Sequence, residues 1–579
     1  MSLLVVLMLA TAMSSTSGFS PEIEHTLSDF IQSTMKCRQV PGLTLAIVRG
    51  NDIWAKGYGV ADLKTGRPVT ERTVFNIASV TKAFTTTLLA IVLQERNLTF
   101  STKISKILGP EYAFVNDIRT REMTIRDLLA HRTGLARLDF TFISGIPKKI
   151  GRAEYSRRLR FLPEKDSFRD GFSYNNLMYA LAGHIAEVLA GDSWENLIIT
   201  RLLLPLGMLE TRLIGSPFDI LQENFAKPYF LTEKGFQPSA LEIYTYFPVE
   251  PAAGLYSTGA DMLKWMRFVL NRGRNEAGIP LVHEALLNEA WETQSMLNMD
   301  DMMGPDSVIE LNKPTFPVSD NQIGYGYGMV ISSYRAYRKW WHDGVFGAYQ
   351  SLEWIFPDMN IGVFLSINGP GTPQIPFRAV RTIMYFVSDL LLGEKPWLNQ
   401  QTSCTFPVPF VQEPMQHQIR LHNAPPPPPP PPPPRNLLEY IGQYGSPLFP
   451  DSIVSTNKGS QTLILQIGAL LFTVFPTNHI DVFELHLIAP VEVALSEGAE
   501  FKPIPTITFI REAFITGFVA NFGADVVFRR GASFFDPIPP AFNRFLNENL
   551  KCWPLPQLPF GKNIPVKSLQ HSFYTNLRF

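Results

Sequence analysis

Apolar residues repeat with two different periods along the chain, and the period changes in blocks. Runs that suit β-strands stand at 42–50 and 53–63, and similar runs return between 328 and 368. Helical periods are expected at 75–94, 175–190, 193–204, 259–272 and 378–392. Strands on both sides of a helical middle predict an α+β domain whose antiparallel sheet is built from the two ends of the domain.

A run of ten prolines, 425–434, divides the chain. Polyproline forms a stiff helix of ~3 Å per residue, so we interpret the run as a spacer; a docking site for a partner with an aromatic groove is the alternative. After the run, short strands separated by turn residues predict a small antiparallel barrel or sandwich. From Asp536 onward the sequence is Pro-rich and aperiodic, which indicates a partly disordered tail.

The first residues of the chain are typical of a secretory signal. An apolar run from Leu3 to Met13 is too short to span a bilayer and is followed by small residues, so we expect a signal peptide over 1–18 and a secreted, extracellular protein. No later segment is apolar enough to predict a membrane span. The expected units are then a domain at 19–396, a linker at 397–435, a domain at 436–535 and a tail at 536–579.

The charge balance argues against polyanionic partners. Charged residues make up 18% of the chain and the net charge is -1, so nothing favours binding to nucleic acid or to an anionic membrane. The three cysteines, Cys37, Cys404 and Cys552, allow one disulfide at most, and the sequence leaves the pairing open. The sequon at Asn97 predicts a surface glycan in a eukaryotic host.

A Ser-x-x-Lys element, Ser79 to Lys82, opens the apolar helical stretch at 75–94. Residues three apart on a helix share a face, so the lysine amine can reach the serine hydroxyl, and burial beside other positive charge would let the lysine act as a base. The alternative is a helix-capping serine beside a solvated lysine. Spacing does not decide between them, because the same spacing recurs at Ser33 and at Ser455.

Two further motifs follow in order and give the element a context. They are Tyr174-Asn175-Asn176 at a loop-to-helix junction and His342-Asp343-Gly344 in a strand. With "TIRDLLAHRTGL", "AAGLYSTGADMLKWM" and "GYGYGM" between them, the chain resembles the serine β-lactamase and penicillin-binding-protein superfamily, in its class C β-lactamase, DD-peptidase, D-aminopeptidase and esterase branch. The resemblance spans about residues 28–392 and implies a β-lactamase/transpeptidase-like domain with an antiparallel sheet and a helical subdomain.

The resemblance implies roles for the motif residues. Ser79 would attack an amide or ester carbonyl, with Lys82 and Tyr174 as the coupled general base and acid. Backbone N–H groups of Ser79 and Val345 would stabilise the oxyanion, and Asn176 would orient Lys82 or the substrate. No cofactor is implied, and the ten histidines show no spacing typical of a metal site.

Two residues depart from the branch and affect the expected substrate. His342 stands where a lysine is usual, and a histidine is only partly charged near neutral pH, so recognition of a substrate carboxylate should be weak or pH-dependent. Asp343 replaces a small hydroxyl residue; facing the pocket, it would repel anionic substrates and favour esterase, amidase or D-aminopeptidase-like activity. Gly344 completes this substrate-binding motif. Asn368, at the end of the next strand, is a further candidate for substrate binding or a turn residue.

The region that begins "YIGQYGSPLFPDSIV" resembles the lipocalin-like β-domain attached to D-aminopeptidase-like and esterase-like members. In them it serves substrate access or assembly more often than catalysis. Two functions are therefore carried forward. One is a secreted serine hydrolase acting on an amide or ester; the other is a protein of the same fold with little or no turnover that binds within an extracellular matrix, as the β-lactamase-like proteins of mollusc shell do.

Overall fold

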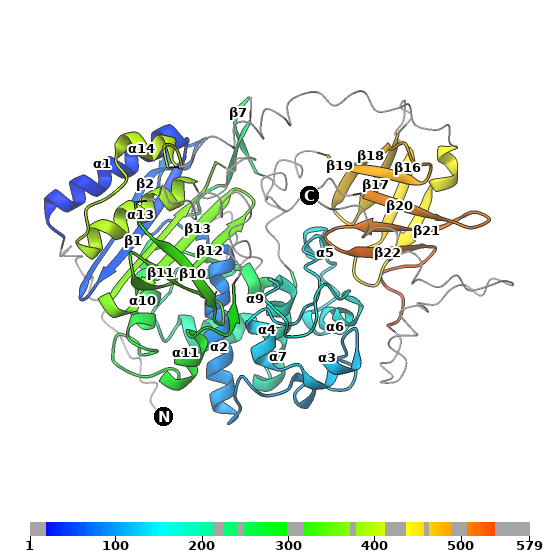
Figure 1. Ribbon diagram of the computed structural model, residues 1–579, viewed down its shortest axis with the longest axis horizontal. Coiled ribbons are helices and arrows are strands. Elements are labelled where there is room, and N and C mark those ends of the chain that lie inside the picture. The colour runs from blue at the N-terminus through cyan, green and yellow to red at the C-terminus, as the bar shows by residue number, and fades with distance from the viewer. Residues whose placement is uncertain are drawn as a thin grey trace, which may run out of the picture.

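The computed structural model describes residues 19–213, 224–232, 234–239, 247–297, 317–370, 378–410, 436–456, 462–488 and 506–538 (Figure 1). The expected signal peptide, the proline run, Cys552 and most of the expected tail lie outside the described residues. Within the described part of the chain, no helix is both long and apolar enough to cross a membrane.

The larger domain is built on a nine-stranded antiparallel sheet. Its order is β3-β2-β1-β14-β13-β12-β11-β10-β9. The strands are β1 (Gly42–Arg49), β2 (Asp52–Asp62), β3 (Arg67–Pro68), β9 (Ser295–Met296), β10 (Asp320–Tyr325), β11 (Val330–Tyr334), β12 (Tyr337–Phe346), β13 (Tyr349–Phe356) and β14 (Ile361–Ile367). Because β1 pairs with β14 at the centre, the two ends of the domain do form one sheet, and the predicted fold class is confirmed.

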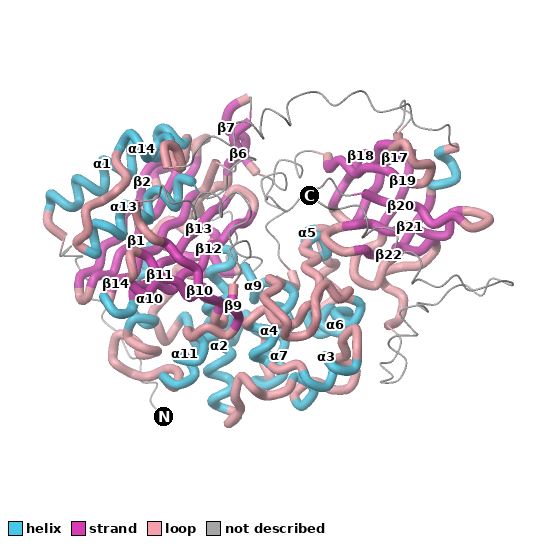
Figure 2. Tube along the Cα trace, viewed as in Figure 1, coloured by secondary structure: helices cyan, strands magenta, loops and turns pink. Residues whose placement is uncertain are grey.

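Helices cover both faces of this sheet (Figures 1 and 2). On one face lie α1 (Pro21–Arg38), α13 (Arg378–Leu392) and α14 (Gln400–Thr405), where Phe30 stacks on Phe386 with ring centroids 3.7 Å apart. On the other lie α10 (Gly259–Leu270) and α2 (Thr81–Glu95), where Phe84 stacks on Trp265. Residues 81–93 of α2 are all buried, so this helix forms the centre of the core rather than one of its surfaces.

A helical subdomain packs around α2. It comprises α3 (Asp117–Glu122), α4 (Ile125–Leu129), α5 (Phe140–Ile143), α6 (Arg152–Arg158), α7 (Asn176–Ala190), α8 (Trp194–Ile198), α9 (Glu250–Ala253) and α11 (Glu284–Ala290). Two small sheets border it, one of β4 (Phe75–Asn76), β8 (Leu255–Ser257) and β5 (Arg212–Leu213), the other of β6 (Tyr229–Thr232) and β7 (Gly235–Pro238).

Two of the predicted helices differ from the observed ones. The helix expected at 75–94 begins only at Thr81, because residues 75–76 pair with β8 and residues 78–80 form a 3₁₀ turn. The helix expected at 193–204 is α-helical only as far as Ile198 and continues as a π-helical turn over Ile199–Leu203. In both places tertiary contacts override a local apolar period.

The smaller domain is a closed eight-stranded antiparallel barrel, so the barrel alternative is confirmed over the sandwich. Its strands are β15 (Gly442–Gly445), β16 (Ser452–Thr456), β17 (Leu463–Ile467), β18 (Leu470–Pro476), β19 (Val482–Leu487), β20 (Thr506–Arg511), β21 (Ile515–Asn521) and β22 (Asp525–Arg530). Alternate residues are buried along most of these strands, as in β18, and aromatic rings fill the interior, where Phe518 stacks on Phe528 at 4.6 Å.

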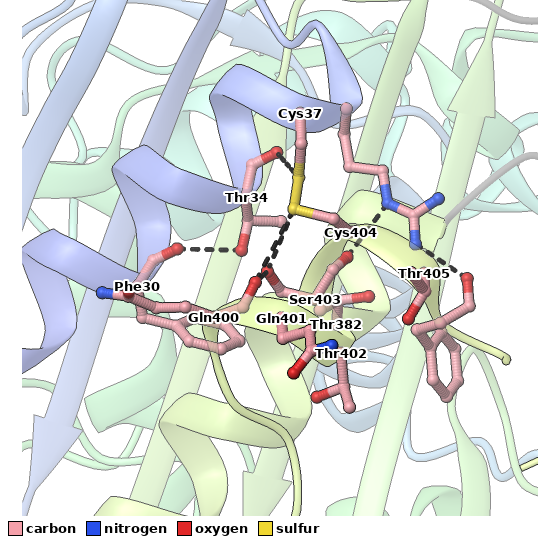
Figure 3. Close-up of a disulfide and its surroundings, with 12 residues drawn as sticks. Phe30, Thr34, Cys37, Thr382, Gln400, Gln401, Thr402, Ser403, Cys404 and Thr405 are labelled. Atoms are coloured by element: carbon pink, nitrogen blue, oxygen red, sulfur yellow. Dashed lines mark hydrogen bonds between the residues drawn. A yellow bond between two sulfur atoms is a disulfide. The ribbon is translucent and has the colours of Figure 1, made fainter. Parts of the chain in front are cut away.

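A disulfide joins Cys37, near the end of α1, to Cys404 in α14 (Figure 3). The pairing that the sequence left open is thereby assigned. Beside the bond, the Arg38 guanidinium donates to the backbone carbonyls of Ser403 and Phe406, at 3.1 and 2.7 Å. The bond therefore fastens the last described helix of the domain to the first, 367 residues apart.

Replacing Cys37 or Cys404 by serine should lower the free energy of unfolding by about 2–4 kcal/mol, because the bond restricts the unfolded chain over a long loop. Urea unfolding of the two single variants and of the double variant measures the change. The double variant should lose no more than either single variant, since each removes the same bond; a loss twice as large would contradict a shared disulfide.

Candidate active site

Ser79 lies in the 3₁₀ turn Ala78–Val80 that leads into α2. Ala78 has φ of 42°, in the left-handed region that a side chain seldom adopts. Two buried hydrogen bonds hold the turn: the Asn76 Oδ1 accepts from the Ala78 N–H at 2.8 Å, and the Ser351 hydroxyl donates to the Ile77 carbonyl at 2.8 Å. Ser79 itself is half-buried and does not cap α2, whose N-cap is Val80.

Lys82, in the first turn of α2, is fully buried beneath Ser79. Its Nζ lies 2.9 Å from the Ser79 Oγ, 2.7 Å from the Asn176 Oδ1 and 2.9 Å from the Ala252 carbonyl oxygen. The amide and carbonyl oxygens can only accept, whereas the serine hydroxyl can also donate. A neutral amine, with two N–H bonds and one lone pair, therefore satisfies all three partners when its lone pair points at the Ser79 hydroxyl.

The electrostatics favour that neutral form. Burial lowers the pKa of Lys82 well below its usual value, and the Arg137 charge lowers it further; the carboxylates of Asp139 and Asp343 act in the opposite direction but do not compensate. The Lys82 environment therefore fulfils the condition set out from the sequence, which was burial beside another positive charge.

Tyr174 completes the contacts of Ser79. Its hydroxyl donates to the Ser79 Oγ at 2.9 Å, and burial raises its pKa well above the usual value, so the phenol keeps its proton. The position follows from the start of α7: Asn175 is the N-cap, its side chain accepting from the Leu177 N–H, and its own N–H donates to the His131 Nδ1 at 3.1 Å. Tyr174 thus reaches the Ser79 oxygen from 95 positions away in the chain, and Asn176 reaches the Lys82 amine from 94 positions away.

Asn176 joins Lys82 to two residues that the sequence did not single out. Its Nδ2 donates to both carboxylate oxygens of Asp139, each at 3.1 Å, and the Asp139 Oδ2 in turn accepts from the Arg137 Nε at 2.6 Å. Both lie just beyond the stretch "TIRDLLAHRTGL", whose resemblance to the family assigns a role to neither residue. An aspartate two residues after an arginine is too common a sequence pattern to indicate a functional role for Arg137 or Asp139.

His342 is buried behind these residues and is neutral. Its Nδ1 lies 2.5 Å from the Asp343 carbonyl, which can only accept, so Nδ1 carries the proton and Nε2 accepts from the Tyr325 hydroxyl at 3.1 Å. Burial lowers the pKa of His342 to about 3. The expectation of a partly charged histidine near neutral pH was therefore wrong, because it took no account of complete burial.

Asp343 and Gly344 lie where β12 runs past the active-site turn. At Gly344 the strand approaches so closely that a Cβ would overlap the Ile77 carbonyl, which places the following residue, Val345, beside the Ser79 turn. Burial raises the pKa of Asp343 to about 6, although the charges of Arg381 and Arg137 oppose the increase. The field of Asp343 reaches Tyr174 as well, where it raises the pKa of the phenol.

Two other predicted residues show no hydrogen bond to this group in the described part of the chain. Asn368 is buried beyond the end of β14, where its Nδ2 donates to the backbone carbonyls of Val60 and Lys227 at 3.3 and 2.9 Å, so its amide nitrogen is engaged in holding a loop. Asn97 is exposed just after α2, with φ of 54°. In the described part of the chain, no group of three or more His, Cys, Asp or Glu side chains could hold a metal ion.

A Ser–Lys–Tyr cluster at the start of a buried helix, beside an antiparallel sheet, defines the class of β-lactamase-fold serine hydrolases. Residues 27–384 match the Beta-lactamase family, and the chain belongs to that family. It is 28% identical over 267 residues to unguisins hydrolase ungD of Aspergillus violaceofuscus, an alignment that covers 44% of this chain and 47% of that protein. The chain therefore spans about half the length of this relative.

Solved structures share the fold. A penicillin-binding protein homologue from Pyrococcus abyssi superposes with a TM-score of 0.53 at 19% identity, covering 87% of this chain and all of that one (100%). A D-amino acid amidase from Ochrobactrum anthropi SV3 superposes with a TM-score of 0.50 at 20% identity, covering 64% of this chain and 99% of that one. The superposition on the Pyrococcus abyssi protein covers a larger share of the chain than the larger domain makes up.

We expect His342 to stay neutral down to about pH 3, because burial away from water disfavours the protonated imidazole. NMR of protein with ¹⁵N-labelled histidine measures this, with the His342 signal assigned by its loss in His342→Gln. A midpoint near the ordinary histidine pKa would contradict the assignment. Because the folded-state pKa is depressed, the stability that neutral His342 contributes is present above the ordinary pKa and is lost as the pH falls toward 3.

Proposed function

We propose that the protein is a serine hydrolase that cleaves an amide or ester bond through an acyl-enzyme at Ser79. The observation that carries the proposal is the contact of the buried Lys82 Nζ with the Ser79 Oγ at 2.9 Å: a neutral amine can give its two N–H bonds to the Asn176 and Ala252 oxygens and accept from the Ser79 hydroxyl. A base already directed at a half-buried nucleophile is what acyl transfer requires, and a purely structural role for the lysine does not need it.

In the proposed reaction the Ser79 Oγ attacks the substrate carbonyl carbon and its proton passes to the Lys82 Nζ. As the tetrahedral intermediate collapses, the bond to the leaving nitrogen or oxygen breaks and that atom receives a proton from the Tyr174 hydroxyl, which recovers one from Lys82. Water then attacks the acyl-enzyme, giving its proton to the same pair, and the acid is released as Ser79 regains its hydrogen. Lys82 and Tyr174 therefore act as one coupled base and acid.

The negative charge of the intermediate needs donors on the side opposite the base. The backbone N–H groups of Ser79 and Val345 are the proposed donors, supported by the close approach of β12 to the turn at Gly344. Such donors typically contribute ~10²–10³ in rate each. Gly344 acts here through its size, since a side chain at this position would force the strand and the turn apart.

The charges around the site support a substrate that carries a positive group near the scissile bond. His342 is neutral and so supplies no cation for a carboxylate, whereas Asp343, with its pKa raised to about 6, is mostly ionised at neutral pH. The likeness of fold to a D-amino acid amidase agrees with an amine-bearing amide, although at 20% identity it supports the fold alone. An α-amino amide or ester is the substrate class that we favour.

We also propose that the protein works outside the cell. The apolar run near the N-terminus supports export, and the Cys37–Cys404 bond supports an oxidising compartment, where such bonds form and persist. Asn97, exposed at the end of α2, is then the proposed glycosylation site.

Labelling with a fluorophosphonate probe tests the nucleophile and the base. We expect a covalent adduct on Ser79 that is absent in Ser79→Ala, and a rate reduced about 10²–10⁴-fold in Lys82→Arg, because a guanidinium keeps its proton. Ser33→Ala and Lys36→Arg are matched controls, since they alter the same spacing on the surface of α1, and they should label like the wild type. No Ser79-dependent adduct would exclude the hydrolase and favour the non-catalytic binding role.

Asp343 should make the preference for positively charged substrates depend on pH. The test uses two esters that differ only in carrying a trimethylammonium or a tert-butyl group. Neither group titrates, so any change with pH in the ratio of their kcat/KM values reflects ionisation of the enzyme. Since the pKa of Asp343 is raised to about 6, the ratio of cationic to neutral ester should be highest above pH 7 and should fall as the pH drops through 6. Asp343→Asn should show the low ratio throughout; a ratio that is unchanged in this variant would contradict the role.

A further inference from the structure

A short segment, residues 137–145, contacts both the active site and the barrel. At its start, Asp139 accepts from the Asn176 amide, and Asn176 accepts from Lys82. Its remainder forms α5 and the turn after it, which lie beside the barrel (Figure 1). The segment thus connects the second domain to the base through Asp139 and Asn176.

Asp139 decides which way the Asn176 side chain faces. An amide can present its oxygen or its NH₂ group to a neighbour, and the two differ little in shape. The Asp139 carboxylate can only accept, so it binds the NH₂ group and leaves the oxygen for the Lys82 Nζ. In the reverse orientation an amide N–H would meet the lysine N–H groups and an amide oxygen would meet the carboxylate, and both contacts would be lost.

The position of Asp139 is itself well determined. Its side chain is only 10% exposed, and Arg137, on the same segment, donates to it at 2.6 Å while the Arg137 guanidinium carbon lies 5.1 Å from the Tyr174 ring centroid. The Arg137 charge thus lies next to both the carboxylate and the phenol. A displacement of this segment would move the charges that surround Lys82 and the amide that binds it.

The barrel holds the segment through close backbone and aromatic contacts. Phe140 packs against Phe522 of the barrel with ring centroids 4.7 Å apart, and the Ala469 N–H donates to the Ser144 carbonyl at 2.8 Å. Gly468 lies so near that a Cβ there would overlap the same carbonyl oxygen. The buried apolar cluster around α2 continues without a break into the barrel interior.

We propose that Asp139 is a positioning residue for Lys82, acting through Asn176, and that the barrel serves catalysis by holding the segment 137–145 in place. The inference rests on the proposed function, since it concerns the base of that reaction. The aromatic filling of the barrel agrees with a scaffold, and the barrel then needs no substrate contact to influence the reaction.

The positioning role of Asp139 is tested with the variants Asp139→Asn and Asp139→Ala, by measuring the Ser79 labelling rate as a function of pH. We expect the rate at its optimum to fall about 10–100-fold as the lysine partner is lost. We also expect the acidic limb to move to lower pH, because burial depresses the pKa of Lys82 and the Asp139 charge opposes this. A merely structural role would lower the rate without moving the limb. Asp170→Asn, a change at an exposed carboxylate of the same domain, should leave both unchanged.

The role of the barrel in holding residues 137–145 is tested with a pair of glycine substitutions. Both Gly468 and Gly531 have positive φ, of 54° and 76°, so alanine strains the backbone at either position. Only at Gly468 does the new Cβ meet the segment, whereas at Gly531 nothing lies within 4 Å. Gly468→Ala should slow Ser79 labelling and increase hydrogen exchange over 137–145, and Gly531→Ala should do neither. The effect of Gly468→Ala should also be smaller when Asp139 is already Asn, because both act through one contact.

The outcomes separate this inference from the proposed function. Wild-type labelling with unaltered rates and pH limbs in both Asp139 variants would overturn the positioning role alone. Unaltered hydrogen exchange in Gly468→Ala would overturn the role of the barrel. If the wild type forms no Ser79 adduct, the proposed function fails, and a crystal structure of Asp139→Ala still decides the contact: Asn176 remaining hydrogen-bonded to Lys82 would overturn the inference, and its departure would support it.

Discussion

The structure around the active site depends on one constraint, the burial of the Lys82 amine. A buried amine must have its polar atoms satisfied, and an ionised one would require strong compensation. Among the described residues, the three hydrogen-bond partners of Lys82 are all neutral. The fold meets the constraint by supplying oxygens from the 3₁₀ turn, from α7 and from α9, and these elements meet only because α2 runs through the centre of the core.

The same burial governs the other ionisable groups of the site. His342 loses its charge, Asp343 becomes a weaker acid, and Tyr174 keeps its proton. Arg137, on a segment that the motifs do not include, places a permanent cation beside the phenol, its guanidinium carbon 5.1 Å from the Tyr174 ring centroid. A guanidinium stays charged whatever its surroundings, so Arg137 supplies a positive charge near the base that neutral His342 does not.

The two domains contribute differently to the active site. The nine-stranded sheet and its helices bring the nucleophile, base and phenol together, whereas the barrel contacts the segment that carries Asp139. The apolar core continues from α2 into the barrel, and this continuity supports the proposed link between the barrel and that segment. Such a link lets a domain affect a reaction without supplying a reacting group.

Local sequence patterns determined much of this protein. The alternating and helical periods predicted the order of strands and helices and the joining of the two ends in one sheet, and three spaced motifs identified Ser79, Lys82, Tyr174 and Asn176, which the structure brings together. Spacing alone could not do so: Ser33 and Lys36 have the same separation, yet that lysine lies exposed on α1. The Ser79–Lys82 pair differs from the Ser33–Lys36 pair in the burial of its lysine, and burial depends on residues far away in the chain.

Only the tertiary structure decided the charges and the supporting contacts. The pKa of His342 and of Asp343, the orientation of the Asn176 amide, the pairing of Cys37 with Cys404 and the hydrogen bonds of the Asn368 amide to backbone carbonyls all result from atoms that come together across tens to hundreds of residues. A sequence period reports which face of an element is apolar. It does not report which polar atom lies opposite another, and that geometry sets the chemistry of the site.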